Sequence, residues 1–256
     1  MKILKSMAIA FSTYSRIPVP TFAWKEEDMR YSMCFFPWVG AVIGGLLWLW
    51  FRMALCLGIG TLSFVLIAVA IPLLVTGGIH VDGYMDTMDA FHSYRTREQK
   101  LEILKDPHIG AFSVIMLAVY GLLYTAGMAQ ITDSRSLMIF CFGFFLSRCL
   151  SAIGVVSLPS AKKEGMLCQF AGSADRRIVK CVLYIQLVLC AGLMIILSWE
   201  RGGIIVAAAF ASYAYYVYRS KKELGGITGD TAGFFVTICE GTMVLAAAAV
   251  SLLLSR

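Results

Sequence analysis

Three regularly spaced aspartates, Asp82, Asp86 and Asp89, are the residues best suited to chemistry in this chain of 256 residues. Their offsets of i, i+4 and i+7 place them within roughly 60° of one helix face. Three like charges on one stripe repel each other unless a cation binds between them. Carboxylates suit Mg²⁺ or Mn²⁺ better than zinc, and Mg²⁺ usually combines one or two of them with substrate phosphates. The stripe therefore predicts a metal ion holding a phosphate or diphosphate.

The simpler interpretation of this stripe is a solvated face at a helix start, where acids favour the helix dipole. It accounts for one or two acids in the first turn. It does not account for a third acid two turns along, among apolar neighbours such as Tyr84, Met85 and Met88. His80 is a weaker signal, because it lies off this face. It could hydrogen-bond a metal ligand or a substrate, or simply sit in the membrane interface.

A second polar motif, Gly225-Gly226-Ile227-Thr228-Gly229-Asp230, opens the last apolar segment. Glycines let the backbone approach a ligand, and successive amides at a helix N-terminus bind anions. Asp230 could add a fourth metal ligand. The alternative is a flexible turn with a Thr or Asp side chain as helix cap. The second acidic motif, on the same side of the membrane, favours the functional interpretation.

Lys105, His108 and Arg148 are further candidates for phosphate contacts, and Glu240 is a possible partner of Arg148. Lys105 and His108 precede an apolar segment and could donate hydrogen bonds, although a plain loop at a helix end explains them equally well. Arg148 and Glu240 lie at similar depths inside apolar segments, where ionisable residues are functional candidates by default. They could form a buried ion pair, or Arg148 could reach a substrate phosphate in a cavity.

Composition predicts an all-α, polytopic membrane helix bundle that forms one integral-membrane domain over residues 1–256. Hydrophobic residues make up 59% of the chain and charged residues 15%, and a spanning helix needs about 20 apolar residues. A short amphipathic helix is expected over 96–105, and residues 1–20 form either another one at the membrane surface or a frayed tail. About seven spans are predicted, at Met33–Leu57, Leu62–Thr76, Ala111–Ile131, Ser136–Ser157, Ile178–Trp199, Ile204–Tyr218 and Gly233–Leu254.

The basic residues predict an N-in, C-out orientation. With the N-terminus inside, 17 of the 22 Lys and Arg residues fall in cytoplasmic segments, as the positive-inside rule requires. All the polar motifs then face the cytoplasm. The net charge of +6 is explained by this topology and requires no nucleic-acid partner. The eight cysteines form no Cys-x-x-Cys pair, which disfavours a zinc or redox site.

Several motifs, in the same order along most of the chain, resemble the adenosylcobinamide-GDP ribazoletransferase (cobalamin synthase) family. Two departures are Tyr84-Met85 where the family often has Leu-Ala, and the absence of an additional Glu near Thr237; neither removes a carboxylate of the main motif. The matching segments are residues 76–89, 15–20, 36–40, 105–112, 163–166 and 225–230.

The resemblance implies a membrane-bound, Mg²⁺-dependent enzyme for the last assembly step of the coenzyme B12 nucleotide loop. Adenosylcobinamide-GDP would react with α-ribazole or its 5′-phosphate, releasing GMP and forming adenosylcobalamin or its phosphate. The expected location is a bacterial or archaeal cell (inner) membrane, surrounded by lipid, with the active site facing the cytoplasm. The resemblance does not decide whether the protein forms a homo-oligomer.

On this hypothesis the ribose 3′-hydroxyl of α-ribazole attacks the phosphorus next to cobinamide, and Asp86 or Asp89 takes the proton. Lys105, His108 or Arg148 stabilises charge on the phosphoryl oxygens. The expected metal ligands are Asp82, Asp86, Asp89 and Asp230. The expected substrate- and cofactor-binding residues are Gly77, Gly78, His80, Asp106, Lys163, Gly225, Gly226, Thr228 and Gly229.

Two other functions are weighed against this one. A CDP-alcohol phosphotransferase also places aspartates along membrane helices, but its Asp-Gly-x-x-Ala-Arg signature is absent, since Tyr84-Met85-Asp86 follows Asp82-Gly83. A cation-coupled transporter would carry more charges near the bilayer midplane and show related repeats. The clustering of the acids at one face disfavours a transporter.

Overall fold

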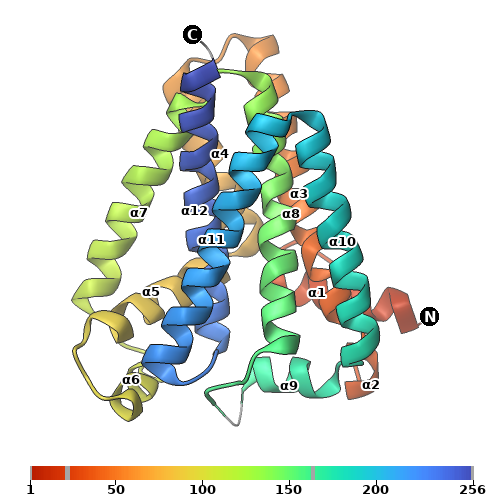
Figure 1. Cartoon of the computed structure of the whole chain (residues 1–256), viewed down its shortest axis with the longest axis vertical. Helices are drawn as coiled ribbons and strands as arrows, with labels where there is room; N and C mark the ends of the chain where they lie inside the picture. Colours follow the sequence, from red (N-terminus) through yellow and green to blue (C-terminus); the bar gives the residue numbers. More distant parts are fainter. Residues whose placement is uncertain (1, 21–23, 163–164, 255–256) are drawn as a thin grey trace.

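The computed structural model describes residues 2–20, 24–162 and 165–254. In these ranges the regular structure is helical apart from one isolated bridge between Ser160 and Ile227, so the all-α prediction is confirmed. Figure 1 shows long helices packed side by side and short helices at the lower end. The elements are α1 (Lys2–Tyr14), α2 (Glu26–Met29), a 3₁₀ turn (Ser32–Cys34), α3 (Phe36–Leu57), α4 (Thr61–Thr76), α5 (Ile79–His92), α6 (Arg97–Ile103), α7 (Ala111–Gln130), α8 (Ser134–Ser157), α9 (Met166–Ser173), α10 (Arg176–Leu197), α11 (Trp199–Leu224) and α12 (Gly229–Leu254).

Five helices in the described ranges, α3, α7, α8, α10 and α12, are long and apolar enough to cross a membrane. A sixth span results if α4 and α5 are counted as one broken segment. The predicted count of seven is therefore not confirmed. The predicted spans at 62–76 and 204–218 fall within α4 and α11, neither of which alone is among these five helices.

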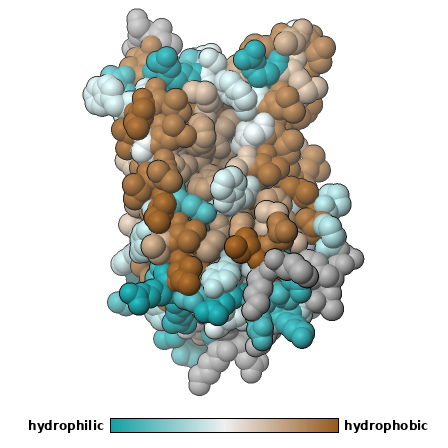
Figure 2. All heavy atoms as spheres, turned by 90° about the vertical axis from the view of Figure 1, so that its right-hand side faces the viewer, coloured by the Kyte–Doolittle hydropathy of each residue, from teal (hydrophilic) through white to brown (hydrophobic). Residues whose placement is uncertain are grey.

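The outer surface of the bundle is apolar over its middle. Figure 2 shows a hydrophobic belt between more hydrophilic ends. Large side chains such as Leu74, Leu122 and Ile196 are more than two-thirds exposed on this surface. A contiguous apolar surface of this size is rare on soluble monomers and is expected of a protein embedded in lipid.

Helix α8 forms the centre of the bundle, and α3, α10, α11 and α12 pack around it. Two glycines of α3 allow the closest of these contacts. A Cβ atom on Gly40 would overlap the carbonyl oxygen of Phe144, and one on Gly44 would overlap that of Cys141. Small residues let membrane helices approach this closely because no side chain separates their backbones.

A sharp break between α4 and α5 turns the acidic segment across the end of the bundle. Gly77 and Gly78 both have positive φ values, of 65° and 81°, which glycine adopts without steric cost. The two helices consequently meet at 93°, and α5 runs across the lower part of the bundle in Figure 1. The side chain of Arg16 packs directly against Gly77. Gly77 and Gly78 thus have a demonstrated structural role at this corner, while binding by them remains a prediction.

The two predicted amphipathic segments form helices. The N-terminal segment is α1, whose Ile9 and Ala10 are buried. The second is α6, which ends two residues earlier than predicted. Its N-terminus is capped by Thr96, whose hydroxyl accepts a hydrogen bond from the Gln99 amide at 3.4 Å, the arrangement of a capping box.

The α3–α8 contact predicts opposite outcomes for two adjacent glycines. Gly44→Val should lower the unfolding temperature in detergent, because overpacking costs about 1–3 kcal/mol or more. Gly45→Val is the matched control, since a Cβ atom there has no neighbour within 4 Å. Thermal unfolding of the two purified variants measures the difference. Equal unfolding temperatures would contradict the packing described here.

Candidate active site

The N-terminal half of α5 lies against the start of α12, and glycines on both helices permit this contact. A Cβ atom on Gly83 would lie 2.7 Å from the carbonyl oxygen of Asp230. On α12, Gly233 faces the backbone of His80, and the Thr237 hydroxyl donates a hydrogen bond to the His80 carbonyl oxygen at 3.1 Å. The crossing brings the two acidic motifs together, as the sequence suggested.

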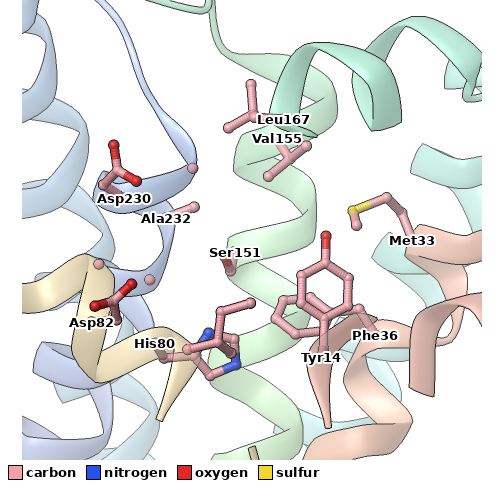
Figure 3. A pocket seen from close by; sticks show the side chains of 14 residues that line it. Tyr14, Met33, Phe36, His80, Asp82, Ser151, Val155, Leu167, Asp230 and Ala232 are labelled. Atoms are coloured by element: carbon pink, nitrogen blue, oxygen red, sulfur yellow. The ribbon is translucent and has the colours of Figure 1, made fainter. Parts of the chain in front are cut away.

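Asp82 and Asp230 both line a cavity beside this crossing, and their carboxylates lie on the same wall (Figure 3). Asp86, one turn further along α5, is partly buried. Helix α5 is not among the five candidate spans. The pKa of the Asp86 carboxyl is raised to about 6, first by burial and then by the charges of Asp82 and Asp230. Lys162 opposes this effect. The three carboxylates therefore repel each other, which favours a bound cation.

Asp89 points to a different neighbour. A Cβ atom on Gly110 would overlap the Asp89 carboxylate, so this side chain packs against the residue that precedes α7. Asp89 does not line the cavity that Asp82 and Asp230 share. Of the three acids, Asp82 lines the cavity, Asp86 lies one turn further along α5, and Asp89 packs against the loop before α7.

Within the described ranges, no three His, Cys, Asp or Glu side chains are arranged to hold a metal ion by themselves. The donor set still fits a hard divalent cation, because mutually repelling carboxylates are supplied by two helices. Mg²⁺ commonly takes only one or two protein carboxylates and completes its shell with water and phosphate oxygens. Asp82 and Asp230, on one cavity wall, match that pattern.

Lys162 is the cation that the structure places in this cluster, and sequence reasoning missed it. Its ammonium group contacts the Asp230 carboxylate at 3.0 Å and donates a hydrogen bond to the Leu104 carbonyl oxygen at 3.3 Å. The segment before it is held to the α12 entry by two backbone hydrogen bonds, Ile227 to Pro159 and Ala161 to Ile227. The only sequence signal was its position next to Lys163, which lies outside the described residues.

The glycine-rich entry to α12 is ordered by its threonines. The Thr228 hydroxyl accepts a hydrogen bond from the Thr231 amide at 3.1 Å, and the Thr231 hydroxyl accepts one from the Thr228 amide at 2.8 Å. Gly225, with φ at 73°, ends α11, and the guanidinium of Arg97 packs against it. The cap expected of a Thr in this segment is therefore present, at Thr228. Anion binding by Gly225, Gly226 and Gly229 stays a prediction.

Lys105 and His108 are placed near the acidic cluster but not in its cavity. The Lys105 ammonium pairs with Glu102 at 2.8 Å, and the His108 ring lies 2.6 Å from Asp106. The side chain of His108 is 88% exposed. The loop that carries these residues begins next to Leu104, which Lys162 contacts, and ends at Gly110, which Asp89 contacts. Substrate contacts by Lys105, Asp106 and His108 remain predictions.

The two charged residues inside the bundle form the ion pair that was one of their two predicted interpretations. Arg148 and Glu240 lie 2.5 Å apart, with side chains 1% and 7% exposed. The same guanidinium also donates to the Phe144 carbonyl oxygen. Neither residue lines the cavity. The geometry gives Arg148 a partner in the protein, and its proposed contact with phosphate has no structural support.

His80 does line the cavity, as part of the wall below Asp82 in Figure 3. The residue is 7% exposed, and its Nε2 atom is buried without a hydrogen-bond partner in the part of the chain that the structure describes. Burial, and secondarily the charge of Arg148, lower the pKa of His80 well below its ordinary value. The imidazole is consequently neutral at physiological pH.

Comparison with known proteins identifies the family. The model of cobalamin-5-phosphate synthase matches residues 6–248. The chain belongs to this family. An adenosylcobinamide-GDP ribazoletransferase of Lachnoclostridium phytofermentans is 42% identical over 240 residues, covering 94% of this chain and 92% of the relative. Relatives of the same name from Clostridium perfringens (31% identical) and Desulfitobacterium hafniense (32% identical) each cover 96% of the chain and 98% of their own length.

No solved structure matches the chain. The family assignment confirms the resemblance noted in the sequence and the expected class, a transferase of cobalamin biosynthesis. It covers nearly the whole chain, including every element that forms the cavity. The α5–α12 crossing lies within the matched residues.

The buried Arg148–Glu240 ion pair gives a prediction that distinguishes a structural role from a catalytic one. Glu240→Gln should destabilise the protein by about 3–5 kcal/mol, because it leaves the Arg148 charge buried and uncompensated. A double variant, Arg148→Met with Glu240→Leu, should recover most of the loss, since apolar residues can replace a buried pair. Unfolding temperatures in detergent measure both effects. If the double variant recovers its unfolding temperature but has no activity, Arg148 or Glu240 has a direct catalytic role.

Proposed function

We propose that the chain joins adenosylcobinamide-GDP to α-ribazole or its 5′-phosphate, releasing GMP, with Mg²⁺ as the required metal. The observation that carries this proposal is the convergence of Asp82 and Asp230, from two helices, on a cavity wall next to Lys162. The names of the relatives supply the substrates. The family match favours this activity over the CDP-alcohol phosphotransferase and transporter alternatives.

In this mechanism Asp82 and Asp230 bind the metal, assisted by Asp86. When bound, Mg²⁺ neutralises diphosphate charge and polarises the phosphorus that is attacked. The 3′-hydroxyl oxygen of α-ribazole forms a bond to the cobinamide-side phosphorus, and the bond from that phosphorus to the GMP oxygen breaks. Asp86, whose carboxyl is coupled electrostatically to Asp82 and Asp230, accepts the hydroxyl proton, whereas Asp89 packs against Gly110.

Lys162 is the residue best placed to stabilise negative charge on the phosphate. Its ammonium group pairs with Asp230 and its side chain is about a quarter exposed, so it can exchange partners. With a cation held by Asp230, Lys162 would be available to donate hydrogen bonds to a phosphate oxygen. Charge-assisted hydrogen bonds of this kind are roughly twice as strong as neutral ones.

We further propose that this end of the bundle faces the cytoplasm of the cell that makes the protein, with the N-terminus inside and the C-terminus outside. The basic loops and all the polar motifs gather at one end of the molecule, and the C-terminus lies at the other (Figure 1). Positively charged loops are retained on the cytoplasmic side. The soluble substrates would then reach the cavity without crossing the membrane.

A reconstituted assay tests the function. Protein in liposomes, given adenosylcobinamide-GDP, α-ribazole and Mg²⁺, should release GMP, and chelation of Mg²⁺ should stop the release. Asp82→Ala should reduce turnover at least about 100-fold, the scale of losing one preorganised charge-stabilising group. It should also weaken Mn²⁺ binding measured by electron paramagnetic resonance. Glu27→Gln, at an exposed acid on α2, is the control and should leave both unchanged. Full activity in Asp82→Ala would remove the metal-site proposal.

The role of Lys162 predicts two effects of opposite sign. Lys162→Met should tighten Mn²⁺ binding to the substrate-free protein, because a competing cation has been removed from Asp230. The same variant should lower kcat about tenfold or more, because a donor to the phosphate is lost. Lys162→Arg keeps the charge and should retain near-normal Mn²⁺ affinity. If Lys162 only anchored its loop, Lys162→Met would weaken metal binding as well as turnover.

A further inference from the structure

The cavity beside the acidic crossing has two chemically different walls. It encloses about 290 Å³ and is lined by α1, α3, α5, α8, α9 and α12. In Figure 3 the carboxylates of Asp82 and Asp230 occupy one side, while the rings of Tyr14 and Phe36 occupy the opposite side. A ligand that fills this space must therefore present a polar, metal-seeking part to one wall and an apolar part to the other.

The aromatic wall is built as a cluster of rings. The centroids of Tyr14 and Phe36 are 4.3 Å apart, and the His80 ring lies 5.6 Å from Phe36 and 6.4 Å from Tyr14. These separations are typical of favourable aromatic packing. A flat ring system entering the cavity would meet ring faces and edges at this wall.

The remaining lining is mostly aliphatic and offers few hydrogen bonds. Met33, Ile79, Val155 and Leu167 contribute apolar side chains, and Ser151 contributes a small hydroxyl. The Nε2 atom of His80 is buried without a hydrogen-bond partner within the described residues. Because leaving a buried polar group unpaired costs free energy, this wall favours a ring that offers one hydrogen-bonding nitrogen and is otherwise apolar.

Size and chemistry together identify the part of the substrates that fits. A volume of about 290 Å³ is at the small end for ligand sites, so the corrinoid macrocycle cannot enter. Guanine carries amide and amino groups along its edges, and the acidic groups that could pair with them are on the opposite wall. In the mechanism proposed above, both of these acids, Asp82 and Asp230, hold the metal. Benzimidazole, in contrast, is flat and nearly apolar.

We propose that this cavity binds the benzimidazole base of α-ribazole, with its ring against Tyr14 and Phe36 and its ribose directed toward Asp82 and Asp230. The proposal rests on the function proposed above and adds the site of one of its two substrates. The orientation brings the attacking ribose hydroxyl to the carboxylate wall while the base is held by the aromatic wall. His80 is a positioning residue at the boundary between them.

A pair of matched substitutions tests the subsite. Ser151→Phe adds a ring inside the cavity. Ala41→Phe, the control, adds the same ring to the separate lipid-side groove between α3, α8 and α10. We expect Ser151→Phe to raise the KM for α-ribazole tenfold or more and to leave the KM for adenosylcobinamide-GDP within twofold. Ala41→Phe should change neither. A selective rise in the KM for adenosylcobinamide-GDP would overturn the proposal in favour of guanine, with the enzymatic function intact.

A binding measurement keeps the test independent of turnover. Equilibrium dialysis of α-ribazole with the metal-free protein in detergent should show saturable binding, and adenosine or guanosine should bind at least tenfold more weakly. Absence of binding, or equal binding of the three nucleosides, would contradict the subsite even if the enzyme is active. Selective binding by a protein without transferase activity would support the subsite and refute the proposed reaction.

A cavity-enlarging variant covers the case in which Ser151→Phe fails to fold. Val155→Ala widens the same cavity from α8. It should improve the binding of a naphthimidazole ribonucleoside relative to α-ribazole by at least threefold. An unchanged preference between these two ligands would count against the proposed location of the base.

Discussion

The turn at Gly77 and Gly78 is the constraint on which the rest of the site depends. Two consecutive residues with positive φ end α4 and start α5 at 93°, and a residue with a Cβ atom would be strained at either position. The bend directs α5 against the start of α12, where Gly83 meets Asp230. The turn thereby lays the acidic helix across the end of the bundle.

The close approach of the α5 and α12 backbones then brings the acids of α5 together with Asp230 of α12. Gly83 and Gly233 remove the side chains that would separate α5 from α12, so acids from distant parts of the sequence share one cavity wall. Burial, and then the repulsion that this closeness creates, raises the pKa of Asp86. The fold holds this unfavourable arrangement because the surrounding helices are fixed by packing and the charge can be offset by a cation.

The ion pairs Arg148–Glu240 and Lys162–Asp230 illustrate two uses of opposite charge. Arg148 and Glu240 are almost completely enclosed and do not line the cavity, so their pair is part of the helix packing. Lys162 and Asp230 are each about a quarter exposed at the cavity. Screening by solvent makes such a pair weak enough to exchange. Only the second pair has the properties of a site that opens to a metal and a phosphate.

The sequence by itself determined the apolar helices, the helical spacing of the acids, and the family through its ordered motifs. These features are local, because hydrophobic runs and i, i+4 spacing depend on neighbouring residues alone. The tertiary structure decided how the polar residues are grouped. Lys162 contacts Asp230, which is 68 residues away in the sequence. Arg148 pairs with Glu240 rather than with a ligand in the cavity, and Asp89 packs against Gly110. Such contacts depend on the bend at Gly77–Gly78 and on helix crossings, which no local pattern specifies because glycine permits many backbone conformations.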